Sequence, residues 1–319
     1  MTTKPQICRD IEGTLLATAT GEAGASARQR VDAHVARCAP CRAELGHYRA
    51  IDSLARALPR TETPSADARA ALITRLADLR RRLMTYGIFP SPLGRVLIAR
   101  SEEGVALVEY LGAATSVRGS RLAGTAGVEL EEDGVEVERL HTELVDYLAG
   151  RRSRLDWPLD LRLASSEFHR AVLAETARVP YGAVTSYTRI AHELGRPAAV
   201  RAVAQALRWN PLPIVVPCHR IVGASGSLTG YAGNRLALKQ RLLSVEGVAT
   251  RRDDHDLRVA RDRMYVRDLD DREYCVPTCG SLAKKTLARL TLFGTREGAE
   301  AAGLAPCTTC RPDLHPLAR

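Results

Sequence analysis

Hydrophobic positions recur at helical spacing over the first quarter of the chain. Over residues 42–58, and again over 67–83, apolar side chains return every three or four positions, which is typical of amphipathic helices. The stripes consist of Leu45, Tyr48, Ile51, Leu54 and Leu58 in the first segment and Leu72, Leu76, Leu79 and Leu83 in the second. The polar residues and the proline of 61–64 interrupt the pattern. We therefore expect a helical region over 1–60 and a linker helix within 61–83.

The pattern changes from helical to strand-like near residue 84. Two β-rich runs, residues 95–100 and 105–110, flank the sequence Ser-Glu-Glu-Gly, which predicts a β-hairpin. An amphipathic helix is expected over 137–148. Strands followed by a helix predict a small α/β subdomain over 84–162.

Short helices separated by sharp turns are predicted from residue 163 onward. Ser166 and Ser186 stand where they can cap helices that run to residues 177 and 194. The turn Gly195-Arg196-Pro197 precedes a further helix over 198–208, and two short helices joined by a glycine-containing turn fit a helix-turn-helix. With a last helix over 234–243, this pattern predicts a helical domain over 163–247.

The remaining segment divides into a polar stretch and a cysteine-bearing module. Charged and polar residues over 248–264 predict a linker, and residues 265–319 predict a small α/β module. The sequence therefore predicts an α/β multidomain protein. Its two central domains are flanked by a helical module at the N-terminal side and by this module at the C-terminal side.

Charge and composition narrow the partners and the compartment. The 319 residues carry a formal net charge of +9, with a pI of about 9.4. This excess of positive charge favours nucleic acid, although a protein with a solvated arginine-rich surface has the same composition. The polar first ten residues and the lack of a long apolar run predict neither a secretory signal nor a membrane span. We expect a cytoplasmic protein, with no membrane partner, whose thiols stay reduced.

One cysteine stands apart from the other seven. Cys218 lies in the run Pro-Ile-Val-Val-Pro-Cys-His-Arg, residues 213–220, where prolines fix the backbone around the thiol. A thiolate is the nucleophilic form of cysteine, and a neighbouring histidine can take its proton when a third group orients the ring. His219 and Glu246 are candidates for these roles. Taken alone, such a pair is more often a buried thiol beside a surface histidine.

Further motifs accompany this run in a fixed order. They are Val179-Pro180-Tyr181-Gly182, Ser186-Tyr187, Arg201-Ala202-Val203, Asn210-Pro211, Pro217-Cys218-His219-Arg220 and Gly230-Tyr231-Ala232-Gly233. With them, residues 84–247 closely resemble the O6-alkylguanine-DNA alkyltransferases, or methylated-DNA–protein-cysteine methyltransferases. The resemblance implies a ribonuclease-H-like α/β subdomain followed by a catalytic winged helix-turn-helix domain.

The resemblance also implies single-turnover DNA repair. In this family an alkyl group passes from O6 of guanine, or O4 of thymine, in double-stranded DNA to the cysteine after the proline, which is Cys218 here. The damaged nucleotide must leave the duplex to reach the thiol. The thioether formed is stable, so each molecule acts once. No organic cofactor is implied, and we expect a monomer.

The family's functional residues carry over position by position. His219 is implied as the base, Glu246 as the group that orients it and Asn210 as the brace of the active-site turn. Tyr187 is implied to assist nucleotide rotation and to protonate the leaving guanine, and Arg201 to fill the gap in the base stack. The further implied residues are Ala202, Arg208 and Arg220 at the DNA and Pro217, Tyr231, Ala232 and Lys239 at the pocket.

Residue type alone leaves blander alternatives for three of these positions. Arg201 also fits a plain phosphate contact, Tyr187 a core aromatic residue and Lys239 a solvated surface charge. Four positions depart from the family pattern and bear on lesion size and pocket shape. They are Leu173, Ala204, Trp209 and Asn234.

Four cysteines near the end of the sequence form two pairs. Cys275, Cys279, Cys307 and Cys310 fit a tetrahedral zinc site with four thiolate ligands. The region resembles the Ada-type metal-binding domain, in which the first such cysteine, Cys275 here, accepts methyl groups from DNA phosphotriesters. We favour structural zinc, because the regulatory helix-turn-helix that accompanies this domain in Ada is not found in the sequence.

A second candidate zinc site lies near the start. Its residues are Cys8, His34, Cys38 and Cys41, the last three spaced as His-x3-Cys-x2-Cys. The region resembles zinc-binding anti-sigma proteins, which implies that residues 1–83 bind a sigma factor. A zinc-stabilised helical module without such a partner is an equal alternative, and a redox-sensing role is a third, because zinc thiolates oxidise.

Two other functions stay open from the sequence. One is a regulator that responds to alkylation or oxidation through its zinc modules. The other is a protein that binds lesions without transferring the alkyl group, although the presence of Cys218 argues against it.

Overall fold

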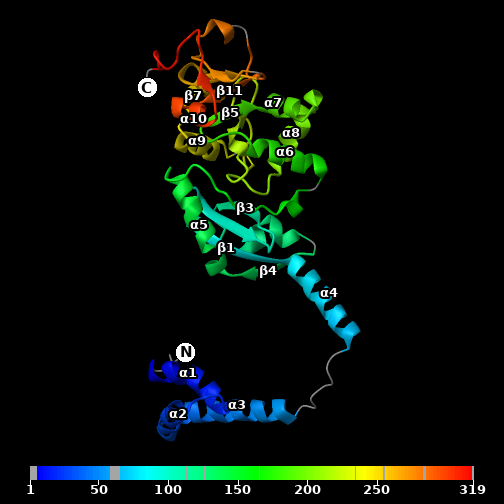
Figure 1. Ribbon diagram of the computed structural model, residues 1–319, viewed down its shortest axis with the longest axis vertical. Helices are drawn as coiled ribbons and strands as arrows, with labels where there is room; N and C mark the ends of the chain where they lie inside the picture. The colour runs from blue at the N-terminus through cyan, green and yellow to red at the C-terminus, as the bar shows by residue number, and fades with distance from the viewer. Residues whose placement is uncertain are drawn as a thin grey trace. The chain divides into compact units, whose positions relative to one another are not determined.

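The chain forms two compact units that divide after Thr74. The computed structural model describes residues 6–57, 65–112, 114–125, 127–164, 166–233, 235–253, 256–269, 271–282 and 285–317 (Figure 1). Among these residues, no helix combines the length and the apolar character needed to span a membrane.

The first unit is helical. It contains α1 (Gln6–Ala19), α2 (Ala25–Arg37) and α3 (Ala39–Ala57), followed by α4 (Ala66–Arg82), which crosses the division between the units. The predicted stripes lie on α3 and α4 except at their last positions: Leu83 begins the first strand of the next unit, and Leu58 lies outside the described residues. The core of this unit is small and consists of Cys8, Ile11, Leu15, Val31, Cys41 and Leu45.

The second unit begins with a four-stranded sheet of order β3-β2-β1-β4 (Figure 1). Its strands are β1 (Leu83–Ser91), β2 (Gly94–Arg100), β3 (Val105–Gly112) and β4 (Glu129–Glu132). The predicted hairpin is β2–β3, and β4 pairs parallel to β1. Alternate residues of the strands pack on α5 (Gly134–Leu148), while Met84, Leu97 and Leu107 contribute to a separate core.

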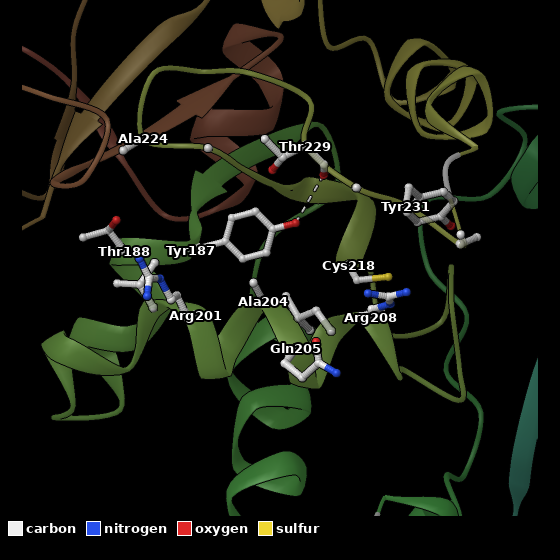
Figure 2. Close-up of a pocket in the computed structure, with 16 residues that line it drawn as sticks. Tyr187, Thr188, Arg201, Ala204, Gln205, Arg208, Cys218, Ala224, Thr229 and Tyr231 are labelled. Atoms are coloured by element: carbon white, nitrogen blue, oxygen red, sulfur yellow. Dashed lines mark hydrogen bonds between the residues drawn. The ribbon is translucent and has the colours of Figure 1, made fainter.

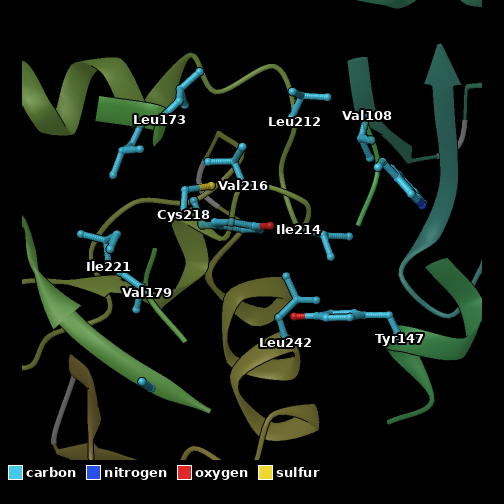
Figure 3. Packing of buried hydrophobic residues seen from close by; sticks show 14 of the residues in the cluster. Val108, Tyr147, Leu173, Val179, Leu212, Ile214, Val216, Cys218, Ile221 and Leu242 are labelled. Carbon is cyan, nitrogen blue, oxygen red and sulfur yellow. The ribbon is translucent and has the colours of Figure 1, made fainter. Parts of the chain in front are cut away.

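A group of helices follows the sheet. They are α6 (Glu167–Ala177), α7 (Tyr187–Glu193), α8 (Val200–Arg208) and α9 (Leu236–Val245). Ser166 and Ser186 cap α6 and α7 as predicted, by accepting hydrogen bonds from backbone N–H groups of the first turn. Figure 3 shows the core beneath them, where Val216 and Ile221 surround Cys218 and Leu242 packs beside Tyr147.

The last segment of the chain forms a sheet with two short strands, β5 and β6, that lie between these helices in the sequence. Its order is β6-β5-β11-β9, with β5 (Ala183–Ser186), β6 (Ile221–Val222), β9 (Tyr265–Asp268) and β11 (Leu290–Phe293). The other elements are the hairpin β7 (Thr250–Asp253) and β8 (Asp256–Val259), the pair β10 (Glu273–Tyr274) and β12 (Ala305–Pro306), and α10 (Arg296–Ala301).

Residues 248–264, expected as a linker, therefore contain a β-hairpin. Leu257 and Val259 of β8 are buried in the core, whereas Arg251 and Arg252 of β7 are exposed. The charged outer face gives this segment the composition of a linker, and the two buried side chains within the hairpin strands are too few to reveal the alternation.

A candidate active site around Cys218

Cys218 begins a single 3-10 turn, Cys218–Arg220, that leads directly into β6. The residue is 8% exposed. The buried Asn210 holds this turn, because its Nδ2 donates to the Val216 carbonyl at 2.9 Å and to Cys218 Sγ at 3.2 Å. Ile214 in the same loop has φ of +77°, a strained conformation for a β-branched residue. The backbone around the thiol is therefore held in place by its surroundings.

The thiol lines a cavity of about 720 Å³. Tyr187 from α7, Arg201 and Gln205 from α8 and Tyr231 from the following loop also line it, and Figure 2 shows them around the same space. The remaining lining residues are Thr188, Val200, Ala204, Leu207, Arg208, Gly223, Ala224, Thr229, Gly230, Ala232 and Gly233. Such a volume accommodates a nucleobase.

Four residues predicted at the DNA or the pocket lie outside the lining, and one of them, Arg220, belongs to the buried group behind the thiol. Pro217, which directly precedes Cys218 in the chain, is buried, and the Lys239 Nζ atom lies over the Tyr187 ring at 5.9 Å from its centroid. Ala202 is exposed on α8 without lining the cavity. Lys239 is fully buried, so the alternative of a solvated surface charge is wrong.

His219 and Glu246 form a buried pair behind the thiol. The His219 Nε2 and Glu246 Oε1 atoms are 2.6 Å apart, and both side chains are fully buried. Burial lowers the pKa of His219 despite the opposing effect of Glu246. Because a carboxylate only accepts hydrogen bonds, Nε2 carries the proton of the neutral ring. The other ring nitrogen, Nδ1, has no hydrogen-bond partner among the described residues, so it is available as a base.

Glu246 is held by three further groups. The Arg220 guanidinium binds both of its oxygens, at 2.9 and 3.1 Å, the Gly182 amide donates to Oε2 at 3.1 Å, and the Tyr147 hydroxyl donates to Oε1. Burial would raise the pKa of Glu246, but His219 and Arg220 hold it well below its usual range. The carboxylate is therefore ionised and fixes the orientation of His219.

Arg220 does not lie where the sequence predicted it. We expected it at the DNA, but it is buried, and its guanidinium is bound by Glu246, Tyr147 and the Val179 carbonyl. A DNA contact would require removal of these hydrogen bonds from a low-dielectric site. The physical reason for its position is the charge of Glu246, which needs a permanent cation beside it.

The resting thiol is protonated. Burial raises the pKa of Cys218, whereas the Asn210 hydrogen bond and the charges of Lys239 and Arg121 lower it. Lys239 donates from Nζ to the carbonyls of Ile221 and Thr229, and burial lowers its own pKa to about 8. Formation of the thiolate therefore depends on the groups that surround the sulfur.

Two tyrosines keep their protons at the cavity wall. Burial raises the pKa of Tyr187 to about 12, and its hydroxyl donates to the Thr229 carbonyl at 3.4 Å. Burial also raises the pKa of Tyr231 well above its usual value, and the Tyr231 and Tyr110 hydroxyls are 2.8 Å apart. Each can act as a hydrogen-bond donor at neutral pH.

The structure adds positioning residues that the sequence analysis missed. Tyr147 from α5 reaches Glu246, Tyr110 from β3 reaches Tyr231, and Arg121 donates to the carbonyls of Trp209 and Asn210. All three come from the first α/β subdomain. These contacts join residues that are 88 or more positions apart in the sequence, so no local spacing could have identified them.

The four departures from the family pattern fall in different environments. Ala204 lines the cavity, Trp209 is exposed just beyond α8, and Leu173 is buried in the core. Asn234 lies outside the described residues.

Both predicted metal-ligand sets are brought together. The ligand atoms of Cys8, His34, Cys38 and Cys41 lie within 4.8 Å of one another, and so do those of Cys275, Cys279, Cys307 and Cys310. All eight cysteines are free of disulfides. Four sulfur or nitrogen ligands at this separation fit a tetrahedral metal site.

Comparison with known proteins connects this geometry to a family. The model for the 6-O-methylguanine DNA methyltransferase ribonuclease-like domain matches residues 84–161, and the model for the DNA binding domain of the same family matches 167–248. A methylated-DNA–protein-cysteine methyltransferase of Methanosarcina acetivorans is 38% identical over 168 residues, which cover 51% of this chain and 99% of that protein. The chain belongs to the 6-O-methylguanine DNA methyltransferase family.

Other relatives also match part of this chain. The methylated-DNA–protein-cysteine methyltransferase of Mycolicibacterium paratuberculosis is 50% identical over 104 residues, 33% of this chain and 61% of that protein. A crystal structure of the Mycobacterium tuberculosis O6-methylguanine methyltransferase is 34% identical, covers 51% of this chain and 92% of its own, and has a TM-score of 0.45. The resemblance predicted from the motifs is confirmed, and the matched family domains end at residue 248.

Proposed function

We propose that this methyltransferase family member repairs alkylated DNA by direct reversal and keeps the alkyl group on Cys218. The observation that carries the proposal is the thiol itself. Its sulfur lines a base-sized cavity, is held there by Asn210, and is followed directly by the buried His219–Glu246 pair. The proposed substrate is double-stranded DNA that contains O6-alkylguanine, with O4-alkylthymine as a second lesion.

The transfer is a displacement at the alkyl carbon. The Cys218 proton passes through a bridging water to the lone pair of His219 Nδ1, and Glu246 stabilises the resulting charge. The thiolate attacks the alkyl carbon, the carbon–sulfur bond forms, and the bond between that carbon and O6 of guanine breaks. The guanine anion then takes up a proton at a ring nitrogen, so the proton that left Cys218 ends on the base and His219 returns to its neutral form. Alkyl cysteine and unmodified guanine are the products.

Tyr187 is the proposed donor to the leaving base. Its high pKa keeps the hydroxyl protonated, and its ring stands at the cavity wall (Figure 2). A hydrogen bond from this hydroxyl lowers the charge that develops on the guanine as its alkyl bond breaks. When a base enters, the hydroxyl must turn from the Thr229 carbonyl.

The exposed face of α8 is the proposed DNA-binding face. Arg201, Ala202, Gln205 and Arg208 are exposed on it, whereas Val203, Ala206 and Leu207 pack inward. We assign α7 and α8 to a helix-turn-helix in which Arg201 fills the space left by the extruded nucleotide. The net charge of +9 supports binding to the phosphate backbone.

Mass spectrometry of the full chain tests this function. After exposure to a duplex with one O6-methylguanine, we expect the Cys218 peptide to gain one methyl group, and Cys218→Ala protein to gain none there. Methylation confined to Cys275, or no methylation at all, would contradict the proposal.

We propose zinc as the metal of both ligand sets. Thiolate and imidazole ligands in groups of four suit Zn²⁺ more than Mg²⁺ or Ca²⁺. The role is structural, because all four ligands of each set come from the protein. The proposed reaction requires no organic cofactor. Elemental analysis should find two zinc ions for each chain.

A second function is proposed for residues 1–83, as a binding site for a sigma factor. The observation that favours a protein partner is the exposure of large apolar side chains, Ile51 and Leu54 on α3 and Leu72 and Ile73 on α4. Size-exclusion chromatography with a purified sigma factor of the host should show a complex. An Ile51→Asp/Leu54→Asp variant should weaken it, and Ala50→Asp on the same helix should not. Absence of any complex would leave residues 1–83 as a zinc-stabilised module.

A further inference from the structure

The four-stranded sheet β6-β5-β11-β9 joins the active site to the C-terminal cysteines. Figure 1 shows two of its strands, β5 and β11, side by side. β5 and β6 belong to the matched family domain. β5 directly precedes Tyr187, and β6 directly follows Arg220. β9 and β11 lie beyond residue 248, outside that domain. β11 pairs with β5 on one side and with β9 on the other, so the two regions form one sheet.

The cysteine ligands are attached to this sheet. Cys275 exchanges two backbone hydrogen bonds with Val266 of β9, at 2.8 and 2.9 Å. Three of the four cysteines are buried in one hydrophobic core with residues of the family domain, including Val184, Val222 and Leu243. The geometry of the cluster therefore affects the packing under β5 and β6.

The end of β11 also reaches the group that orients His219. The Gly294 amide donates to the Gly182 carbonyl at 2.8 Å, and the Gly182 amide in turn donates to Glu246 Oε2 at 3.1 Å. The contact leaves no room for a side chain, because a Cβ on Gly294 would lie 2.3 Å from the Gly247 carbonyl oxygen. A short path of hydrogen bonds thus leads from β11 through Glu246 to His219, the residue next to Cys218.

We propose that the C-terminal cluster, with a divalent ion such as Zn²⁺ bound, keeps β9 and β11 in place and thereby positions Glu246 for alkyl transfer. Four mutually close thiols fit such an ion, and without it the ligand loops lose the cross-link that holds them to β9. Gly294 is then a positioning residue of the repair reaction. The inference rests on the proposed role of Cys218 but concerns residues outside the family domain.

Gly294→Ala in the full chain tests the contact without altering a metal ligand. We expect unchanged zinc content, transfer of the methyl group slowed roughly tenfold through the loss of a charge-assisted hydrogen bond to Glu246, and a higher pH midpoint for Cys218 reaction with a small thiol reagent. Gly280→Ala is the matched control, because its Cβ meets nothing within 4 Å. A wild-type rate and pH midpoint in Gly294→Ala would overturn the proposal.

Cys310→Ser tests the metal. We expect loss of one zinc ion for each chain, faster hydrogen exchange at the amides of Gly182 to Ser186 and slower methyl transfer. Loss of that zinc with unchanged exchange and transfer would refute the coupling.

If wild-type protein never methylates Cys218, the proposed function fails instead, while the exchange measurement still decides whether the cluster supports β5. Should Cys310→Ser not fold, the pH midpoint of Gly294→Ala still decides the question.

Discussion

At the scale of single residues, Asn210 determines how the thiol is presented. Its Nδ2 donates to the Val216 carbonyl and to Cys218 Sγ, and its Oδ1 accepts from the Leu212 amide. Asn210→Asp keeps the acceptor, removes both donors and places a negative charge beside the sulfur. We expect a higher pKa for Cys218 and methyl transfer slowed roughly 10- to 100-fold. The rate of Cys218 alkylation against pH measures both, and a wild-type profile would exclude this role.

Lys239 gives the stability of the protein a pH dependence of its own. Burial lowers its pKa to about 8 in the folded state, compared with 10.5 for an exposed lysine. Between these values the unfolded chain binds more protons, so this residue makes the free energy of unfolding rise with pH, by at most about 3 kcal/mol. In Lys239→Met that contribution should disappear. Urea unfolding at pH 8 and pH 10 measures it, and equal pH slopes in the two proteins would contradict a buried, titrating amine.

At the scale of elements, α5 supports the site through one hydroxyl. Tyr147 donates to Glu246 and accepts from Arg220 Nη2 at 3.0 Å. Tyr147→Phe removes both hydrogen bonds and should destabilise the fold by about 1–3 kcal/mol and slow methyl transfer. Tyr181→Phe is the matched control, because its hydroxyl donates to the Val245 carbonyl rather than to Glu246. Thermal unfolding and single-turnover rates of the two variants separate the effects, and equal transfer rates would remove Tyr147 from the mechanism.

The distance in sequence between interacting residues explains which elements could be predicted from the sequence. Helices with local signals were predicted closely, because the caps Ser166 and Ser186 and the apolar stripes act within a few residues. Cys218 and His219 were recognisable because they are adjacent and belong to an ordered motif set. The shared sheet was not predicted, since β5 and β11 are four residues each and pair across more than a hundred positions. Arg220 was misplaced for a similar reason: its partners Glu246 and Tyr147 are distant in sequence.

At the scale of the whole molecule, the two units differ in what stabilises the fold of each. The second unit has extended cores, whereas the core of the first unit consists of six buried residues, two of which are proposed metal ligands. So small a core cannot offset the conformational entropy of three helices, and units of this size often depend on a metal. The first unit should therefore fold only with its zinc bound.

Cys41→Ser tests this dependence, because Cys41 is both a ligand candidate and a core residue. We expect circular dichroism at 222 nm to lose the helical signal of α1 to α3, since a tetrahedral site with one ligand removed binds zinc far more weakly. The second unit has its own cores, so its thermal transition should stay at the wild-type temperature. Ala50→Asp, an exposed change on α3, is the control and should keep the full signal. If Cys41→Ser retained that signal with one zinc fewer, the six-residue core would suffice by itself, and metal binding would not be what folds the first unit.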